Sequence, residues 1–436
     1  FYYPIKGALS WARRRSATAS PQSSQSFRPA WTGPRSAIKI SRGATQRIIW
    51  ILALLVLAGG LTVAFFHLRD KIFPSTTFEL NDELGGNIFP SLILSTATTD
   101  TLIVAPTEKG ALGNPKSGIS IQITSPVKDA RLHVEVAETP FFKRSVSEFI
   151  LPEEGKAYTV YPDILWNYDA LRNNTQAEPI TVSVEVQIKD REASQRVRTF
   201  SVRSINECLI GYNDKKNRFH NTGVLFAAYV NEDSPLIDKI LREALNTRIV
   251  NRFMGYQNKR KDYVDKQVYA LWNVLQRRKF RYSSISYSSL SSNVVYSQRV
   301  RTLEDALASS QINCVDGSVL FASLLRAINI DPILVRIPGH MYVGYYTDRS
   351  HNQANFLETT MIGDIDLDDF FPEEKLDSTS EGKSQEEMSR LTFEKSKEYA
   401  RRKYSADSAR IHTLPRQYMF LEISKALRRK IQPLGK

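Results

Sequence analysis

Cysteine is scarce in this 436-residue chain, which contains only Cys208 and Cys314. Two cysteines are too few for a disulfide-rich scaffold, and the chain has no C-x-x-C pair of the kind that binds zinc. The six histidines include no pair spaced four residues apart, and no glycine-rich loop of the phosphate-binding kind occurs. We therefore expect no metal and no cofactor, while one Cys208–Cys314 disulfide could still form outside the cytoplasm.

Acidic residues are absent from residues 1–47, which hold nine of the 59 Lys and Arg residues. The rest of the chain is left with 50 basic and 46 acidic residues, so most of the net charge of +13 comes from this one segment. Such a distribution argues against a nucleic-acid-binding fold and against nucleic acid as a partner. The segment is rich in Ser, Ala and Pro without an apolar period, which predicts a basic, flexible, cytoplasmic tail.

Charged residues are also absent from residues 48–66, which read IIWILALLVLAGGLTVAFF. A helix of this length is about 28 Å long, close to the thickness of the hydrocarbon layer of a membrane. We expect an uncleaved transmembrane helix over 48–67 that contacts the lipid bilayer, with the basic tail before it in the cytoplasm. This predicts a single-pass membrane protein whose later domains lie outside, in the periplasm if the cell is Gram-negative.

Short β-branched runs dominate residues 76–205. In the run 180–188, apolar residues alternate with polar ones, which is typical of a strand with one buried side. Six such runs predict an antiparallel β-sandwich, immunoglobulin-like, that serves as a spacer or binding module. The runs are 91–97, 119–125, 131–138, 157–162, 180–188 and 197–204.

From about residue 220 the apolar period becomes helical, and the pattern predicts an α+β domain over 220–436. The fold class expected for the whole chain is therefore α+β: one N-terminal transmembrane helix, the β-sandwich and this C-terminal domain. The charged segment 374–410 is expected to be mostly helical and to lie on the surface of this domain. The predicted helices are 235–250, 263–278, 303–309, 315–329 and 419–431, and the predicted strands are 333–338, 341–347 and 355–358.

The most informative stretch surrounds Cys314, at the predicted start of an apolar helix. Asn313 is a good N-cap residue, and Asp316 falls where a carboxylate suits the positive end of the helix. Free N–H groups and the helix dipole at this place stabilise a thiolate, and the same N–H groups can bind an oxyanion. Tyr282 and Asn313 are candidates for a further oxyanion donor.

A histidine and a carboxylate are expected to meet near this cysteine. If the chain reverses at the polar turn about Arg349, antiparallel counting puts His340 opposite Glu358. Directly opposed residues share a face of the sheet, with Cβ atoms about 5 Å apart. A carboxylate there can fix the imidazole tautomer, which predicts a nucleophile, a base and an orienting acid in Cys314, His340 and Glu358.

These features resemble the transglutaminase-like superfamily, in a bacterial, membrane-anchored form. The resemblance rests on a helix-starting Cys314 with Asp two residues on, an apolar helix, a Gly-His strand and an acidic residue ending the next strand, within 260–362. It implies a papain-like α+β fold and a Cys–His–Asp triad that performs acyl transfer. It also implies that Cys314 is the nucleophile and His340 the base, whereas the third residue is Glu358 in place of the family's Asp.

The leading hypothesis is a membrane-anchored thiol enzyme that acts on amide or peptide bonds of a protein or peptide in the cell envelope. With water as the acceptor it would be a cysteine peptidase or amidase, and with an amine a transglutaminase. The alternative is a catalytically retired scaffold or protein-binding module. A redox thiol protein is a third reading, but no second cysteine lies close in sequence to Cys314. The sequence gives no oligomeric state.

Overall fold

The protein is described by a computed structural model whose contacts divide it into two compact units, 1–68 and 69–436, and each unit is described by itself. Most of the predicted basic tail, up to residue 41, lies outside the described residues. The described residues are 42–72, 75–189, 191–258, 260–283, 292–363, 365–374, 376 and 382–435.

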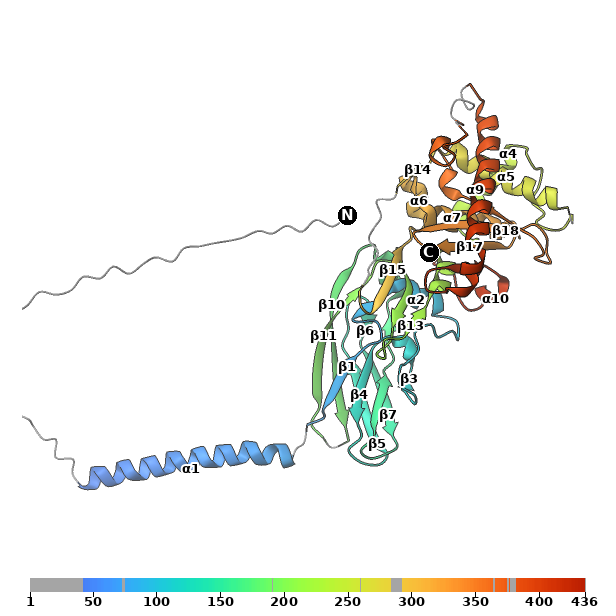
Figure 1. The fold of residues 1–436 in the computed structure, drawn as a ribbon. Helices are drawn as coiled ribbons and strands as arrows, with labels where there is room; N and C mark the ends of the chain where they lie inside the picture. The colour runs from blue at the N-terminus through green and yellow to red at the C-terminus, as the bar shows by residue number, and fades with distance from the viewer. Residues whose placement is uncertain are drawn as a thin grey trace, which may run out of the picture. The chain divides into compact units, whose positions relative to one another are not determined.

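Helix α1 (Arg42–Ile72) is one continuous helix of 31 residues, drawn in blue in Figure 1. It contains the segment 48–67, for which the sequence predicted a transmembrane helix. That prediction is wrong: within the described part of the chain, no helix combines the length and the apolar character needed to cross a membrane.

The chain from residue 75 onward is a mixture of helices and several sheets. Its first part holds a four-stranded sheet, in the order β1-β4-β8-β3, and a five-stranded sheet, in the order β2-β11-β10-β5-β7. Side chains such as Ile121, Val134 and Val184 come from both sheets and share one apolar core. The long strands are β4 (Ser120–Thr124), β5 (Ala130–Val136), β7 (Ser145–Leu151), β8 (Ala157–Tyr161), β10 (Glu178–Ile188) and β11 (Ser194–Val202).

Shorter elements complete this part. The run 91–97, predicted as a strand, is instead the helix α2 (Pro90–Thr96), because Pro90 suits the first position of a helix and a short apolar run fits either structure. The remaining elements are β1 (Phe78–Asn81), β2 (Asn87–Ile88), β3 (Leu112–Gly113), η1 (Pro115–Ser117), the paired β6 (Phe142–Lys143) and β9 (Leu165–Trp166), and α3 (Tyr168–Asn173).

Residues 207–221, at the border between the two predicted domains, supply two strands of a three-stranded sheet. Strand β12 (Glu207–Asn213) pairs with β13 (Phe219–Asn221) and with β15 (Val295–Arg299). Cys208 and Leu209 of β12 are fully buried in the core that also holds the helices around Cys314. Residues 207–221 therefore belong to the packed structure of the second part.

The second part is built on the sheet β19-β18-β17-β20, whose strands are β17 (Pro332–Ile337), β18 (His340–Tyr346), β19 (Ala354–Leu357) and β20 (Met419–Glu422). One face packs Leu334 and Val343 against helix α7 (Cys314–Ala327). The other face packs Val335 and Tyr342 in a core that includes Ala400 of helix α9 (Gln385–Thr413). The predicted helix 419–431 is wrong for its first four residues, which form β20 because they pair with β17. A short helix, α10 (Lys425–Arg428), follows within the predicted range.

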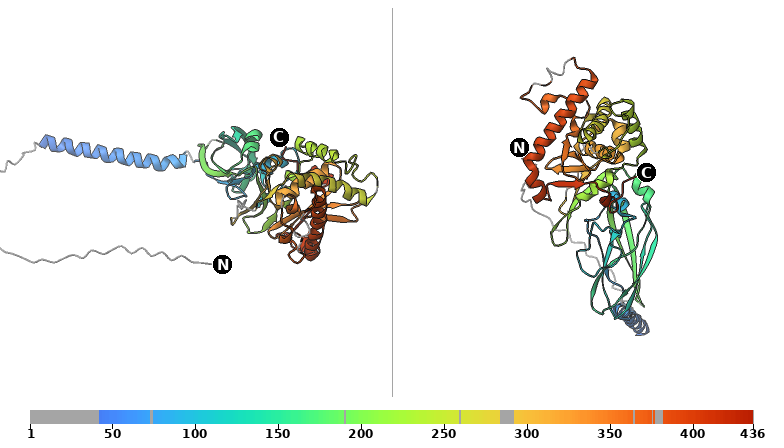
Figure 2. Two further views of the ribbon diagram at one scale, coloured as in Figure 1. Left: turned by 90° about the horizontal axis from the view of Figure 1, so that it is seen from above. Right: turned by 90° about the vertical axis from the view of Figure 1, so that its right-hand side faces the viewer.

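Helix α9 also packs on helix α5 (Lys261–Arg277), where Phe393 contacts the rings of Tyr269 and Trp272. Figure 2 shows the orange-red α9 beside the yellow-green α5. The other elements here are η2 (Gly223–Tyr229), α4 (Pro235–Asn246), the paired β14 (Arg281–Tyr282) and β16 (Gln311–Ile312), α6 (Leu303–Ser309), η3 (Thr359–Met361), η4 (Leu367–Asp369) and α10 (Lys425–Arg428).

Candidate active site

Cys314 is the first residue of helix α7 and is partly exposed. The Asn313 side chain accepts a hydrogen bond from the N–H of Asp316 at 2.8 Å, and the Asp316 carboxylate accepts one from the N–H of Asn313 at 3.1 Å. This reciprocal capping box fixes where the helix begins. The N–H groups of Cys314 and Val315 belong to the first turn and have no acceptor inside the helix, so they can face an oxyanion.

Asp316 is a structural residue of this helix start. It is buried and also accepts hydrogen bonds from the N–H and the guanidinium of Arg301, at 2.8 and 2.5 Å. Burial raises the pKa of the Asp316 carboxyl, against the lowering effect of its bonds to Arg301 and Asn313. Every contact of Asp316 thus serves to hold the first turn of α7 in place.

His340 begins strand β18 directly after a two-residue turn. Strands β17 and β18 pair from Ile337 opposite His340, so Pro338 and Gly339 form the whole reversal. Gly339 has a φ of +73°, a conformation that glycine adopts without strain, and Pro338 supplies the fixed φ of the preceding turn position. The turn therefore places the imidazole at the end of the sheet, with 19% of its side chain exposed.

Glu358 meets His340, but not through the predicted register. Strand β19 pairs Tyr346 with Ala354 and Val343 with Leu357, so the observed pairing is offset by two residues from direct opposition of His340 and Glu358. The predicted direct pairing is wrong, although an offset of two keeps the same face of the sheet. Glu358 follows the strand, caps η3 and places its Oε2 2.6 Å from His340 Nε2.

The side chain of Cys314 lies close enough to His340 to raise its pKa. Because Nε2 faces Glu358, the ring nitrogen left for the sulfur is Nδ1. Burial by itself lowers the pKa of His340, but the hydrogen bonds and charges of Cys314 and Glu358 outweigh burial and raise that pKa to about 9. An imidazolium near neutral pH is the partner that a Cys314 thiolate requires.

The two candidate oxyanion donors, Asn313 and Tyr282, differ in their positions and contacts. The side-chain oxygen of Asn313 caps α7, so this residue acts in the helix start. Tyr282 lies on β14, which runs parallel to β16 with Tyr282 opposite Ile312, two residues before Cys314. Tyr282 is 48% exposed.

Cys208 and His351 lie in other surroundings. Both cysteines are free thiols, and Cys208 is fully buried, which raises the pKa of its thiol. His351 bonds Asp331 at 3.1 Å and stacks on Tyr346, a packing role. Over the part of the chain that the structure describes, no three His, Cys, Asp or Glu side chains gather as metal ligands would.

Sequence reasoning missed two residues that touch Glu358. Thr360 bonds the second carboxylate oxygen, and Ser396 bonds the main chain of Glu358. The position of Thr360, two residues after Glu358, could have indicated that its hydroxyl contacts the carboxylate. Ser396 gave none, because it stands 38 residues further along the chain in a segment that reads as charged and exposed.

No protein-family model matches this chain, and no curated protein matches it either. What the site can do is therefore set by its own geometry: a cysteine at a helix N-terminus, an imidazole beside it, and a buried carboxylate that meets the imidazole.

Proposed function

We propose that the protein is a thiol enzyme that acts on amide or peptide bonds by acyl transfer. Cys314 is the nucleophile, His340 the general base and acid, and Glu358 the residue that orients the imidazole. The observation that carries this proposal is the 2.6 Å contact between His340 Nε2 and the buried Glu358 carboxylate, on an imidazole whose pKa the neighbouring Cys314 also raises. This is the nucleophile–base–orienter order that covalent catalysis requires.

The reaction begins with the Cys314 thiolate and the His340 imidazolium. The sulfur attacks the carbonyl carbon of the amide, a C–S bond forms, and the carbonyl oxygen gains the negative charge. The free N–H groups of Cys314 and Val315 at the start of α7 then bind that oxygen. When the intermediate collapses, the C–N bond breaks, and His340 gives its proton to the leaving amine.

The thioester that remains on Cys314 is released in a second step. Water or an amine gives a proton to the neutral His340 and attacks the thioester carbon, and the C–S bond breaks to restore the thiolate and the imidazolium. Water yields a carboxylic acid, which is hydrolysis, and an amine yields a new amide, which is transamidation. Throughout both steps, Glu358 keeps the proton of Nε2 in place, so that Nδ1 exchanges its proton with the reacting groups.

The test compares the two cysteines of the same folded molecule. Near neutral pH, iodoacetamide should alkylate Cys314 quickly and leave the buried Cys208 unmodified. A nitrophenyl ester should acylate Cys314 with a burst of nitrophenol, which mass spectrometry locates on the peptide that contains Cys314. Cys314→Ala should remove both signals. If Cys314 reacts no faster than Cys208 in the folded protein, the enzyme proposal fails, and a retired scaffold is the better description.

A further inference from the structure

Helix α9 presents a buried row of hydroxyl groups, although many of its residues are charged. Ser389, Thr392 and Ser396 are spaced three and four residues apart, so they lie on one side of the helix. The first two hydroxyls bind α5: Asn273 Nδ2 donates to Ser389 Oγ at 3.0 Å, and Trp272 Nε1 donates to Thr392 Oγ1 at 3.1 Å. These bonds fix the position of α9 along α5.

The third hydroxyl of the row binds the main chain of Glu358. The N–H of Glu358 donates to Ser396 Oγ at 2.8 Å, and Ser396 Oγ lies 3.3 Å from the carbonyl oxygen of Glu358, to which it can donate. Ser396 and Glu358 are both fully buried. One hydroxyl therefore holds both polar main-chain groups of Glu358, at the point where β19 has ended and pairing with β18 no longer fixes the backbone.

The carboxylate of Glu358 is held by its neighbour Thr360. Its Oε1 accepts a hydrogen bond from Thr360 Oγ1 at 2.8 Å and from the N–H of Thr360 at 3.3 Å. The other oxygen, Oε2, faces His340. A terminal carboxylate rotates with a broad, two-fold preference, so saturating one oxygen decides which oxygen meets the imidazole. A carboxylate buried without such partners would be costly.

We propose that Thr360 and Ser396 are positioning residues of the acyl-transfer reaction, and that helix α9 is thereby part of the catalytic apparatus. This inference rests on the proposed function, because positioning has meaning only if Cys314 and His340 react. Thr360 fixes the rotation of the carboxylate, and Ser396 fixes the backbone that carries it. Neither residue touches the reacting atoms, and both act through Glu358 on the proton affinity of His340.

The expected signature is a shift in a pH profile. The titratable side chains that raise the pKa of His340 are Cys314 and Glu358, and the ring of Tyr342 has its centre 6.3 Å from that of His340. The contacts with Cys314 and Glu358 keep His340 charged up to its pKa of about 9. A displaced or protonated Glu358 would support the imidazolium less, so His340 would lose its proton at lower pH.

The experiment follows alkylation of Cys314 by the anionic reagent iodoacetate, which the imidazolium attracts. In the parent protein, the rate should fall on the alkaline side with a midpoint near pH 9. Thr360→Val keeps the shape of the side chain but removes its hydroxyl, and we expect a midpoint at lower pH and a rate at pH 8 lowered by about tenfold. Thr360→Ser, which keeps the hydroxyl, should restore both. Ser396→Ala should shift the midpoint in the same direction as Thr360→Val.

Ser389→Ala is the matched control on the same face of α9. It removes a buried hydroxyl bond to Asn273 and has no contact with Glu358, so it should lower the free energy of unfolding but leave the midpoint unchanged. A midpoint that stays at the parent value in folded Thr360→Val and Ser396→Ala overturns this inference alone. So does an equal shift in Ser389→Ala. A parent protein whose Cys314 does not react selectively overturns the proposed function itself.

Discussion

At the scale of single residues, the site depends on a glutamate that lies just beyond its strand. Strand β19 ends at Leu357, and Glu358 already caps the following turn, so its carboxylate approaches His340 from past the end of the strand pairing. The longer side chain spans that offset and still leaves Oε1 within reach of Thr360. The glutamate therefore suits this backbone.

We predict that Glu358→Gln retains the fold and lowers the rate of Cys314 acylation by roughly a thousandfold. A glutamine that bonds Thr360 through its oxygen presents an N–H to His340 Nε2, which moves the imidazole proton to Nδ1 and removes the base that faces Cys314. The measurement is the burst rate with a nitrophenyl ester, beside circular dichroism to check the fold. Glu358→Asp, shorter by one methylene, should fall between the parent and Glu358→Gln. An unchanged burst rate in Glu358→Gln would leave Glu358 with a purely structural role.

At the scale of elements, the close packing of α7 on η3 brings the two halves of the site together. Gly317, in the first turn of α7, lies against Thr359, and a Cβ atom at Gly317 would come within 2.8 Å of Thr359 Oγ1 and 3.0 Å of its Cβ. Thr359 also lies 3.5 Å from the carbonyl oxygen of Cys314. Because Thr359 directly follows Glu358, the glycine sets how closely the carboxylate and the cysteine approach.

We predict that Gly317→Ala lowers the rate of Cys314 acylation by up to about a hundredfold, because the added methyl group pushes η3 away and misaligns Glu358 and His340. Adding Thr359→Gly, which removes both contacting atoms, should restore part of the rate. Glycine inside a helix is otherwise less stable than alanine by about 1 kcal/mol. A Gly317→Ala protein that is more stable and equally reactive would therefore show that the contact does not matter.

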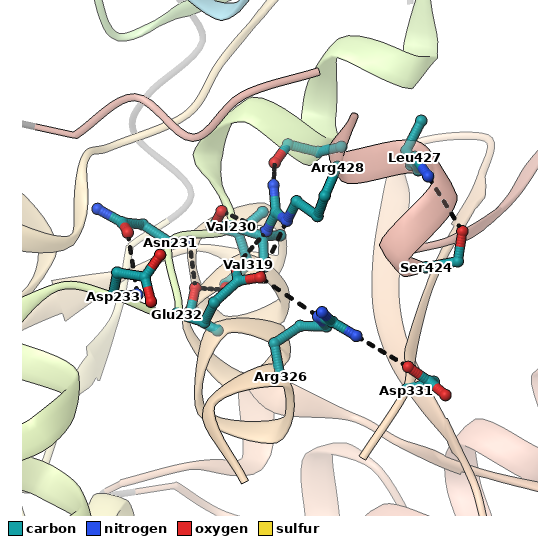
Figure 3. A network of polar contacts seen from close by, with 12 residues as sticks. Val230, Asn231, Glu232, Asp233, Val319, Arg326, Asp331, Ser424, Leu427 and Arg428 are labelled. Carbon is teal, nitrogen blue, oxygen red and sulfur yellow. Dashed lines mark hydrogen bonds and ion pairs between the residues drawn. The ribbon is translucent and has the colours of Figure 1, made fainter. Parts of the chain in front are cut away.

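At the scale of the whole molecule, the C-terminal segment joins the two parts of the unit 69–436. Arg428 donates hydrogen bonds to the carbonyl oxygens of Ala227 and Val230. It also pairs with Glu232, which in turn pairs with Arg326 of α7 (Figure 3). Just beyond Arg428, the N–H of Gln432 donates to the carbonyl of Ser95 on α2, and that of Leu434 donates to Ala228. These contacts cross between the first part and the helices around Cys314.

We predict that Arg428→Met lowers the free energy of unfolding by about 3 kcal/mol. The substitution removes the hydrogen-bond donor of two carbonyl groups and the ion pair to the Glu232 carboxylate. Urea denaturation followed by tryptophan fluorescence measures this loss. The neighbouring Arg429 is exposed, and Arg429→Met should change stability by less than about 0.5 kcal/mol. Equal losses in the two variants would mean that the arginine network does not hold the segment.

What the sequence determined by itself about the site is local. The capping pair Asn313 and Asp316 fixes where α7 begins, and Pro338-Gly339 fixes the turn before His340, because caps and tight turns depend on residues only a few positions apart. The alternation in 180–188 likewise predicted strand β10, since a half-buried strand repeats every two residues. The transmembrane helix predicted over 48–67 from the length of its apolar run was wrong.

Only the tertiary structure decided which distant groups meet. The offset of β19 against β18 depends on the length of the connecting turn, so counting from Arg349 missed the pairing of Glu358 by two residues. The contact of Ser396 with Glu358 joins residues 38 positions apart, and the burial of β12 depends on its pairing with β15. Such contacts are set by how elements pack, and no local pattern of side chains encodes them.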